Sequence, residues 1–515
     1  MNSKPNQNER KKKGSQKRTL IKSGIVLTVF GLIAKFIGLF YRIPLTNLLG
    51  ANGIGTYQLI FPVYALLVSV VSSAVPILVS RNLNSLENEK LKKGFFTESL
   101  IYSAIIGLLS GVLLVLSAKL LGLLQGRQEV EYGYYVIAPA VFFVSVLSAF
   151  RGWFNSELRT IHTALTGVFE QLFKLSGILV CYLAKITGFR AVLIALGGIV
   201  LSEFVACLYA FIVFFIRGGR LTRAVVKVPF KAFFQASVPL TVGGLVFPLA
   251  LFVDSILVTR LLTLSGLPYN DAVTEYGIFS GAVGPLINLP QSLAISFAVT
   301  MIPVVARHKR ERNIQGVKQG ENSSLTAVLS ISLPSAVALF VVAESIIAFL
   351  YPSFSGEQQS RAVFLLKIQV IQIPILSVLQ LYGAYLQALD KGVTSARNMM
   401  ISGGIKLALN FTAIKWGIMG IVVANTVCYA VCAVLDIICS RKLSGKNKYE
   451  GGIVLIIASA VMGVAMSLIS DAIKNNILSL VLSVLIGSSI YVIILLTFKK
   501  IGEKLRFKAK NTEEL

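Results

Sequence analysis

The chain has 515 residues, of which 55% are hydrophobic and only 14% are charged, and its mean hydropathy is +0.76. Soluble globular proteins carry about 25% charged residues, so this composition excludes a cytosolic enzyme, a disordered protein and a disulfide scaffold. The long apolar runs instead predict a protein whose solvent is the lipid bilayer. At about 20 residues per membrane-spanning helix, the length allows roughly 12 to 15 spans.

The apolar runs predict an all-α polytopic membrane protein with about fourteen transmembrane helices. The first run contains Lys35 and Arg42 and lacks a small-residue cleavage site, so it is not a cleaved signal peptide. In chain order the spans are expected near residues 23–44, 57–80, 97–118, 133–150, 163–184, 191–216, 232–260, 276–303, 325–350, 362–389, 396–414, 417–440, 452–470 and 477–498.

Lysine and arginine gather on alternate loops between these spans. Of the 49 such residues, 36 lie on the side that holds both termini, eight lie on the opposite side and five lie inside spans. The positive-inside rule then places both termini of this multi-pass membrane protein in the cytoplasm. Most of the net charge of +26 is therefore a topology signal, and we expect membrane lipids rather than nucleic acid as partners.

The sequence contains no motif that would support catalysis or a bound metal. A phosphate-binding G-x-x-x-x-G-K-[ST] loop and an H-E-x-x-H zinc motif are both missing, and the outer loops are too short for a catalytic domain. We therefore expect a protein that is not an enzyme and has no cofactor or metal. The cysteines are interpreted as small apolar residues within spans. They are Cys181, Cys207, Cys428, Cys432 and Cys439.

A weak internal repeat relates the two halves of the chain. Prolines and a terminal arginine recur at offsets of 226 to 228 residues, which pair Pro62 with Pro290, Pro76 with Pro303, and Arg81 with Arg307. The offset predicts a duplication of six helices into parallel, pseudo-symmetric lobes around a central cavity. Because proline removes a backbone hydrogen bond, the four prolines are candidate helix hinges. General tolerance of proline in membrane helices is the alternative interpretation.

The repeat divides the chain into five regions. They are a basic cytoplasmic tail at residues 1–22, an N-lobe of six spans at 23–225, a C-lobe of six spans at 226–440, a helix hairpin at 450–498, and a second basic tail at 499–515.

Lys35 and Arg42 are the sharpest candidate site among the charges inside spans. They lie seven residues apart on one face of the first span, and neither has an acidic residue three or four positions away. Burying an unpaired charge in the bilayer costs about 2.5 to 3.5 kcal/mol, so such cations need a partner. They could hold an anionic head group such as a pyrophosphate. Alternatively, Arg42 snorkels to the interface and Lys35 forms an ion pair with another helix.

The remaining intramembrane charges have several interpretations. Glu170 and Lys174 are four residues apart and can pair with each other on one helix. Asp254 is a candidate carboxylate for coupling to Na⁺ or protons, with pairing to a neighbouring cation as the alternative. Glu203 and Asp436 are expected to pair with Lys367 or Lys406, and Glu344 near a span end is expected to be solvated. All of these charged residues lie within the spans given above.

Several segments of the chain together resemble the SpoVB and MurJ-like lipid flippases. They are residues 34–38 (AKFIG), 41–44 (YRIP), 49–58 (LGANGIGTYQ), 150–154 (FRGWF) followed by Glu170-Gln171, and 285–290 (PLINLP). The resemblance runs over the whole chain. It implies the fold of the multidrug/oligosaccharidyl-lipid/polysaccharide (MOP) exporters. It also implies export of an undecaprenyl-pyrophosphate-linked cell-wall precursor by alternating access.

The resemblance implies a head-group cavity formed by Lys35, Arg42, Arg151, Glu170 and Lys174. Lys35 stands where family members usually carry arginine, which keeps the charge but loses the bidentate geometry. Gram-negative lipid II flippases carry further arginines in spans two and eight, which this sequence lacks, and this difference favours the SpoVB branch.

Lipid II is the default cargo, and a lipid-linked oligosaccharide is the expected partner of a protein that acts as a monomer. A flippase for a teichoic-acid or other polysaccharide unit, and a cation-coupled multidrug exporter, are the alternatives. Coupling to Na⁺, to protons or to the membrane potential is left open. A membrane glycosyltransferase would need acidic catalytic residues on a long outer loop, and the outer loops here are short.

Overall fold

The computed structural model describes residues 7–222, 230–299, 302–389, 391–445, 449, 451–473 and 476–513. These residues form helices joined by turns and include no β-strand. Contacts divide the chain into two compact units. The first comprises Met1–Thr263 and Pro268–Gly277, and the second comprises Leu264–Leu267 and Ile278–Leu515. The all-helical class predicted from the apolar runs is confirmed.

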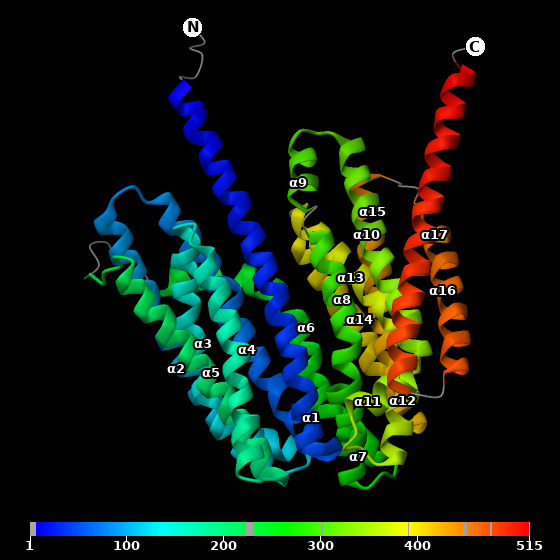
Figure 1. The fold of residues 1–515 in the computed structure, drawn as a ribbon. Helices are drawn as coiled ribbons and strands as arrows, with labels where there is room; N and C mark the ends of the chain where they lie inside the picture. The colour runs from blue at the N-terminus through cyan, green and yellow to red at the C-terminus, as the bar shows by residue number, and fades with distance from the viewer. Residues whose placement is uncertain are drawn as a thin grey trace. The chain divides into compact units, whose positions relative to one another are not determined.

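The first unit contains seven helices over the described part of the chain, coloured from blue to green in Figure 1. Neighbours in sequence pack together, α2 on α3 and α4 on α5, and α1 packs on both α3 and α4. The helices are α1 (Gln7–Ser85), α2 (Glu89–Gln125), α3 (Val130–Ser156), α4 (Thr160–Leu183), α5 (Gly188–Ile216), α6 (Phe230–Leu264) and α7 (Tyr269–Tyr276).

The second unit continues from a π-helical segment at the end of α7 and finishes with a pair of long helices that pack on each other, α16 and α17 (Figure 1). Its elements are η1 (Gly277–Val283), α8 (Gly284–Val299), α9 (Ile302–Arg310), α10 (Ile314–Val341), α11 (Ala343–Leu350), α12 (Gly356–Gln369), α13 (Gln372–Ala388), α14 (Gly392–Thr412), η2 (Ala413–Trp416), α15 (Ile418–Ser444), α16 (Gly452–Ala472) and α17 (Asn476–Glu513).

Among the described residues, ten helices are long and apolar enough to cross a membrane, and the bent pair α12 and α13 raises this number to eleven if it forms one span. The first candidate, Val29–Ser85, has 57 residues. Because about 20 residues cross a bilayer, this helix is long enough for two of the expected spans. The chain is therefore a multi-pass membrane protein, and the total of about fourteen spans stays a prediction.

Helix α1 changes direction at Gly50. This residue has φ 66° and ψ 179°, and it is the position with non-helical dihedrals within the described length of α1. That backbone region is open essentially only to glycine. Pro62 and Pro76 lie inside α1 without such a break. The break separates the part of α1 that carries Arg42 from the part that carries the side chains contacting it.

An aromatic cluster fixes helices α2, α3 and α5 in the first unit. Phe96 lies 4.9 Å from Phe214 and 5.7 Å from Phe150, measured between ring centroids. Trp153 meets Phe214 edge-on at 4.8 Å. Such aromatic pairs add about 0.5 to 1.5 kcal/mol each beyond the area they bury. The cluster therefore holds α3 in a fixed rotation, and with it Arg151, which lies between Phe150 and Trp153 in the sequence.

Helix α6 packs in the first unit, one helix later than the predicted lobe boundary at residues 225 and 226. Arg260 donates from Nε to the carbonyl of Leu124 at 2.9 Å and also hydrogen-bonds the carbonyl of Leu123. The last carbonyls of a helix lack partners within it and attract cations, so the end of α2 holds α6. The duplication itself stays a prediction.

Candidate functional site

Arg42 is held by neutral side chains that follow the break in α1. Its Nη1 donates to Oε1 of Gln58 at 3.1 Å. Its Cζ lies 5.5 Å from the ring centroids of both Tyr57 and Phe61. Over the described residues no carboxylate forms an ion pair with it. Aromatic faces and an amide attract a cation without cancelling its charge, so the guanidinium keeps a positive charge that can attract an anion.

Three aromatic side chains extend from Arg42 along one face of α1. Tyr57 stacks on Phe61 at 5.5 Å, and Phe61 contacts Tyr64 at 5.9 Å. Residues three and four apart share a helix face, which explains the row. At its end the hydroxyl of Tyr64 donates to Oε1 of Glu203 at 3.2 Å. The row therefore connects Arg42 to a buried carboxylate on α5.

Glu170 on α4 pairs with Arg151 on α3. The Nε of Arg151 also donates to Oγ1 of Thr166 at 3.0 Å. Both charged side chains are largely buried, with exposed fractions of 19% and 15%. The predicted pairing of Glu170 with Lys174 is therefore wrong, because a guanidinium fixed by Thr166 presents a planar donor fork that suits a carboxylate better than a flexible lysine does.

Four charged side chains form what we call the polar cluster: Arg151, Glu170, Lys174 and Glu203. The other three members all lie within electrostatic reach of the buried Glu203 carboxylate. The cluster contains two cations and two carboxylates, so its charges balance one another. It therefore leaves no carboxylate over to balance the charge of Arg42, which lies outside the cluster. The cluster thus brings together three of the five residues predicted to bind the head group, Arg151, Glu170 and Lys174, and Arg42 lies in the same unit.

Helix α1 approaches the polar cluster closely through Gly38. A Cβ atom at that position would lie 3.1 Å from Oε1 of Gln171, the neighbour of Glu170. Lys35 lies one turn earlier in α1, but its side chain is outside the described residues. Helix α1 therefore carries its cations past the helix that bears Glu170 and Lys174.

The other predicted charged residues have different surroundings. Asp254 is buried on α6, with 4% of its surface exposed. Asp436 accepts hydrogen bonds at 2.7 Å from Ser395 and from Asn398. The expectation that Glu203 and Asp436 pair with a lysine is therefore wrong, because neutral donors on adjacent helices reach both carboxylates.

Lys367 instead binds Glu344, with 2.8 Å between Nζ and Oε1. The side chain of Glu344 is 77% exposed, which agrees with its predicted solvation.

The predicted hinge prolines lie inside helices. Pro62 and Pro76 are in α1 and Pro290 is in α8. Pro303 is in α9, but its side chain is outside the described residues. Their role as hinges stays a prediction. Sequence reasoning missed Gly50, for which the run of three glycines at positions 50, 53 and 55 between two apolar runs was the available signal.

The comparisons with known proteins agree with this arrangement. Residues 20–309, more than half of the chain, match the family model described as polysaccharide biosynthesis protein. The chain is 23% identical to stage V sporulation protein B of Bacillus subtilis (strain 168), over 79% of this chain and 81% of that one. It is also 23% identical to lipid II flippase MurJ of the same organism, over 87% and 88%.

Solved structures share the fold. Lipid II flippase MurJ in an inward closed conformation superposes with a TM-score of 0.76 at 15% identity, covering 92% of this chain and 99% of that chain. An inward-facing multidrug resistance MATE family transporter of the MOP superfamily gives 0.68 at 14% identity, covering 82% and 98%. The resemblance to SpoVB and MurJ-like proteins is thereby confirmed, and the chain belongs to the polysaccharide biosynthesis protein family, with the fold of the MOP superfamily.

Proposed function

We propose that this chain is a flippase that moves an undecaprenyl-pyrophosphate-linked cell-wall precursor across the bacterial cytoplasmic membrane by alternating access. The observation that carries the proposal is the state of Arg42, whose guanidinium contacts an amide and two aromatic rings but forms no ion pair over the described residues. The polar cluster and Lys35 on the same unit supply the rest of the head-group site. The chain acts as a transporter rather than an enzyme, as a monomer with both termini in the cytoplasm.

A pyrophosphate fits the surroundings of Arg42 on physical grounds. Hydrogen bonds between guanidinium and phosphate are charge-assisted and about twice as strong as neutral ones. The rings of Tyr57 and Phe61 exclude water from one side of the cation, which strengthens its attraction for an anion. A cationic substrate would instead meet repulsion at this position. This argument favours a lipid-linked anion over the cationic drugs that a multidrug exporter would carry.

Lipid II is the cargo we propose first, because one relative over most of the chain is named a lipid II flippase. A teichoic-acid or other polysaccharide unit on the same carrier is the alternative cargo. It has the same pyrophosphate and would use the same cation.

We propose Asp254 as the carboxylate that couples export to Na⁺ or protons, since it is buried on α6, which the sequence predicts to be the seventh span. Replacing Asp254 by Asn would then abolish the dependence of export on the Na⁺ or the proton gradient, measured by collapsing each gradient separately in cells. Unchanged dependence on both gradients in that variant would remove Asp254 from the coupling step.

The proposal is tested by depleting the protein in cells that have no other flippase. An enzyme that cleaves lipid II is added outside, and the cleaved fraction is measured with wild type, Arg42→Ala and Arg42→Lys. We expect depletion to protect lipid II, wild type to restore cleavage, Arg42→Ala to fail, and Arg42→Lys to restore part of it because charge remains without the bidentate fork. Arg361→Ala is the matched control, since Arg361 lies 5.7 Å over Phe364 in the second unit.

Two outcomes would contradict the proposal. If lipid II stays accessible after depletion, lipid II is the wrong cargo, and the same assay with other lipid-linked saccharides decides between the alternatives. If Arg42→Ala, present in the membrane at the wild-type amount, transports as well as Arg361→Ala does, the basic site is wrong.

A further inference from the structure

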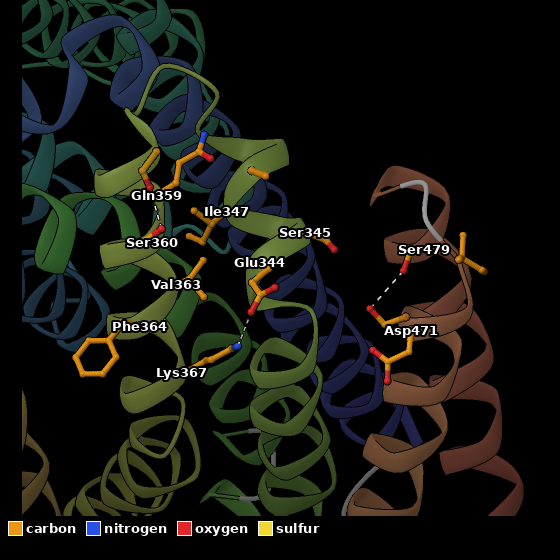
Figure 2. A pocket seen from close by; sticks show the side chains of 14 residues that line it. Glu344, Ser345, Ile347, Gln359, Ser360, Val363, Phe364, Lys367, Asp471 and Ser479 are labelled. Atoms are coloured by element: carbon orange, nitrogen blue, oxygen red, sulfur yellow. Dashed lines mark hydrogen bonds and ion pairs between the residues drawn. The ribbon is translucent and has the colours of Figure 1, made fainter.

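The second unit contains a polar pocket that plays no part in the proposed transport site. Its volume is about 920 Å³, and it lies between helices α11 and α12 on one side and the adjoining ends of α16 and α17 on the other. Figure 2 shows Glu344 and Lys367 on one wall and Asp471 and Ser479 on the opposite wall. The pocket could therefore contact a ligand from two directions.

The two walls differ in how their charges are satisfied. On the first wall, Lys367 and Glu344 form the exposed pair described above. On the second wall, the hydroxyl of Ser479 donates to that of Ser470 at 3.4 Å. Asp471, next to Ser470, has neither an ion pair nor a hydrogen bond from any side chain in the described part of the chain. The pocket thus offers one free carboxylate, one carboxylate that already has a partner, and one ammonium group.

The charge balance selects the class of ligand. Two carboxylates against one lysine make the lining negative, so the pocket favours a ligand that carries a positive group. A divalent metal would need several more oxygen ligands on one side. Among the described residues, no group of three or more His, Cys, Asp or Glu side chains is arranged to hold one. An organic ammonium fits better, because it can donate hydrogen bonds to carboxylates and serine hydroxyls on separate walls.

The surroundings of the pocket point to a lipid as the source of this ammonium. Helices α16 and α17 are both apolar enough to span a membrane, and the pocket lies where one ends and the other begins. Large apolar side chains near it are exposed, with 41% of Phe364, 67% of Leu468 and 51% of Leu478 accessible. A polar pocket beside exposed apolar side chains at the end of two spans is suited to a head group whose acyl chains run along the helices.

We propose that this pocket binds the head group of a membrane lipid that carries a primary ammonium. The ammonium lies against Asp471 and reaches toward Glu344, and the lipid phosphate faces Lys367. Arg441 and Lys442 in the last turn of α15 precede the start of α16, and the basic residues 499–510 lie in the last part of α17, away from the pocket. The positive-inside rule therefore assigns the pocket to the outer leaflet. This site is independent of the proposed transport function, since it uses none of the residues near Arg42.

Lipid retention by the purified full-length chain tests the proposal. The chain in detergent is titrated separately with phosphatidylethanolamine, with phosphatidylcholine and with soluble phosphoethanolamine, and bound molecules are counted by native mass spectrometry. We expect tight retention of phosphatidylethanolamine alone, because the trimethylammonium of phosphatidylcholine has no N–H to donate. Asp471→Asn should weaken that retention about fivefold, in the range of one exposed charge interaction, and Glu344→Gln should weaken it less.

Glu357→Gln is the matched control for both variants. Glu357 lies on α12 at the same end of the unit and is exposed, but it does not line the pocket, so its replacement should leave retention unchanged. Equal retention of the two phospholipids, or an effect of Glu357→Gln as large as that of Asp471→Asn, would overturn the proposed site. Binding of soluble phosphoethanolamine as tight as that of the lipid would overturn the lipid as its source.

Discussion

Two buried carboxylates, Glu170 in the first unit and Asp436 in the second, are stabilised by different kinds of partner. In the first unit, Glu170 forms an ion pair with Arg151, and both side chains are mostly buried. In the second unit, Asp436 receives hydrogen bonds from the neutral side chains of Ser395 and Asn398. One carboxylate thus depends on a cation, and the other depends on dipoles.

This difference determines what each carboxylate loses when one partner is removed. Breaking a buried ion pair leaves an uncompensated charge, which costs about 3 to 5 kcal/mol. Removing one of several neutral donors costs about 1 to 3 kcal/mol, because the other donors remain. The comparison also bears on function. A cation in an ion pair can exchange its carboxylate for an anionic substrate, whereas neutral donors only stabilise the carboxylate. Two of the three substitutions below test this comparison, and Gly50→Ala tests the break in α1 of the first unit.

Glu170→Gln should have the largest effect, a loss of about 3 kcal/mol in the free energy of unfolding, because Arg151 is left buried without its counter-charge. Reversible unfolding of the purified protein in detergent measures the change. The double variant Arg151→Met, Glu170→Gln is the control and should recover most of the loss, since neither member of the ion pair then carries a charge that lacks its partner. If the double variant is as unstable as the single one, packing rather than charge accounts for the loss.

Gly50→Ala should cost about 2 kcal/mol in the free energy of unfolding, because alanine is strained at φ 66° and ψ 179°. A Cβ atom there meets nothing within 4 Å, so the loss reports backbone strain alone. Gly31→Ala is the matched control. It also meets no atom within 4 Å and lies in regular helix, so alanine should be neutral or slightly stabilising. Equal effects of the two substitutions would mean that the break at Gly50 is not required.

Asn398→Leu should have the smallest effect, a loss of about 1.5 kcal/mol in the free energy of unfolding, because Asp436 keeps the hydrogen bond from Ser395. The same unfolding experiment measures it. A loss as large as that of Glu170→Gln would erase the difference between the units. Ser402→Ala serves as a control on the same helix, since the hydroxyl of Ser402 donates to a backbone carbonyl at 2.8 Å and not to Asp436.

The candidate site was predictable in part. Arg42 could be found from the sequence because it is an unpaired cation in an apolar run, and that property is local. The partner of Glu170 could not be found in the same way. Lys174 is four residues away on the same helix, whereas Arg151 is 19 residues away on another helix. A sequence indicates which residues are neighbours on one helix, but it does not indicate which residues meet between helices. The contact between Tyr64 and Glu203, which are 139 residues apart, was missed for the same reason.

The sequence by itself determined that this protein is helical and crosses the membrane many times. These properties follow from runs of neighbouring residues, because the bilayer selects each span by its own hydropathy. Only the tertiary structure decided which charges meet, where α1 breaks, and that Glu344, Lys367 and Asp471 line one pocket. Those outcomes depend on how helices rotate and pack against one another, and side chains far apart in the chain determine that packing.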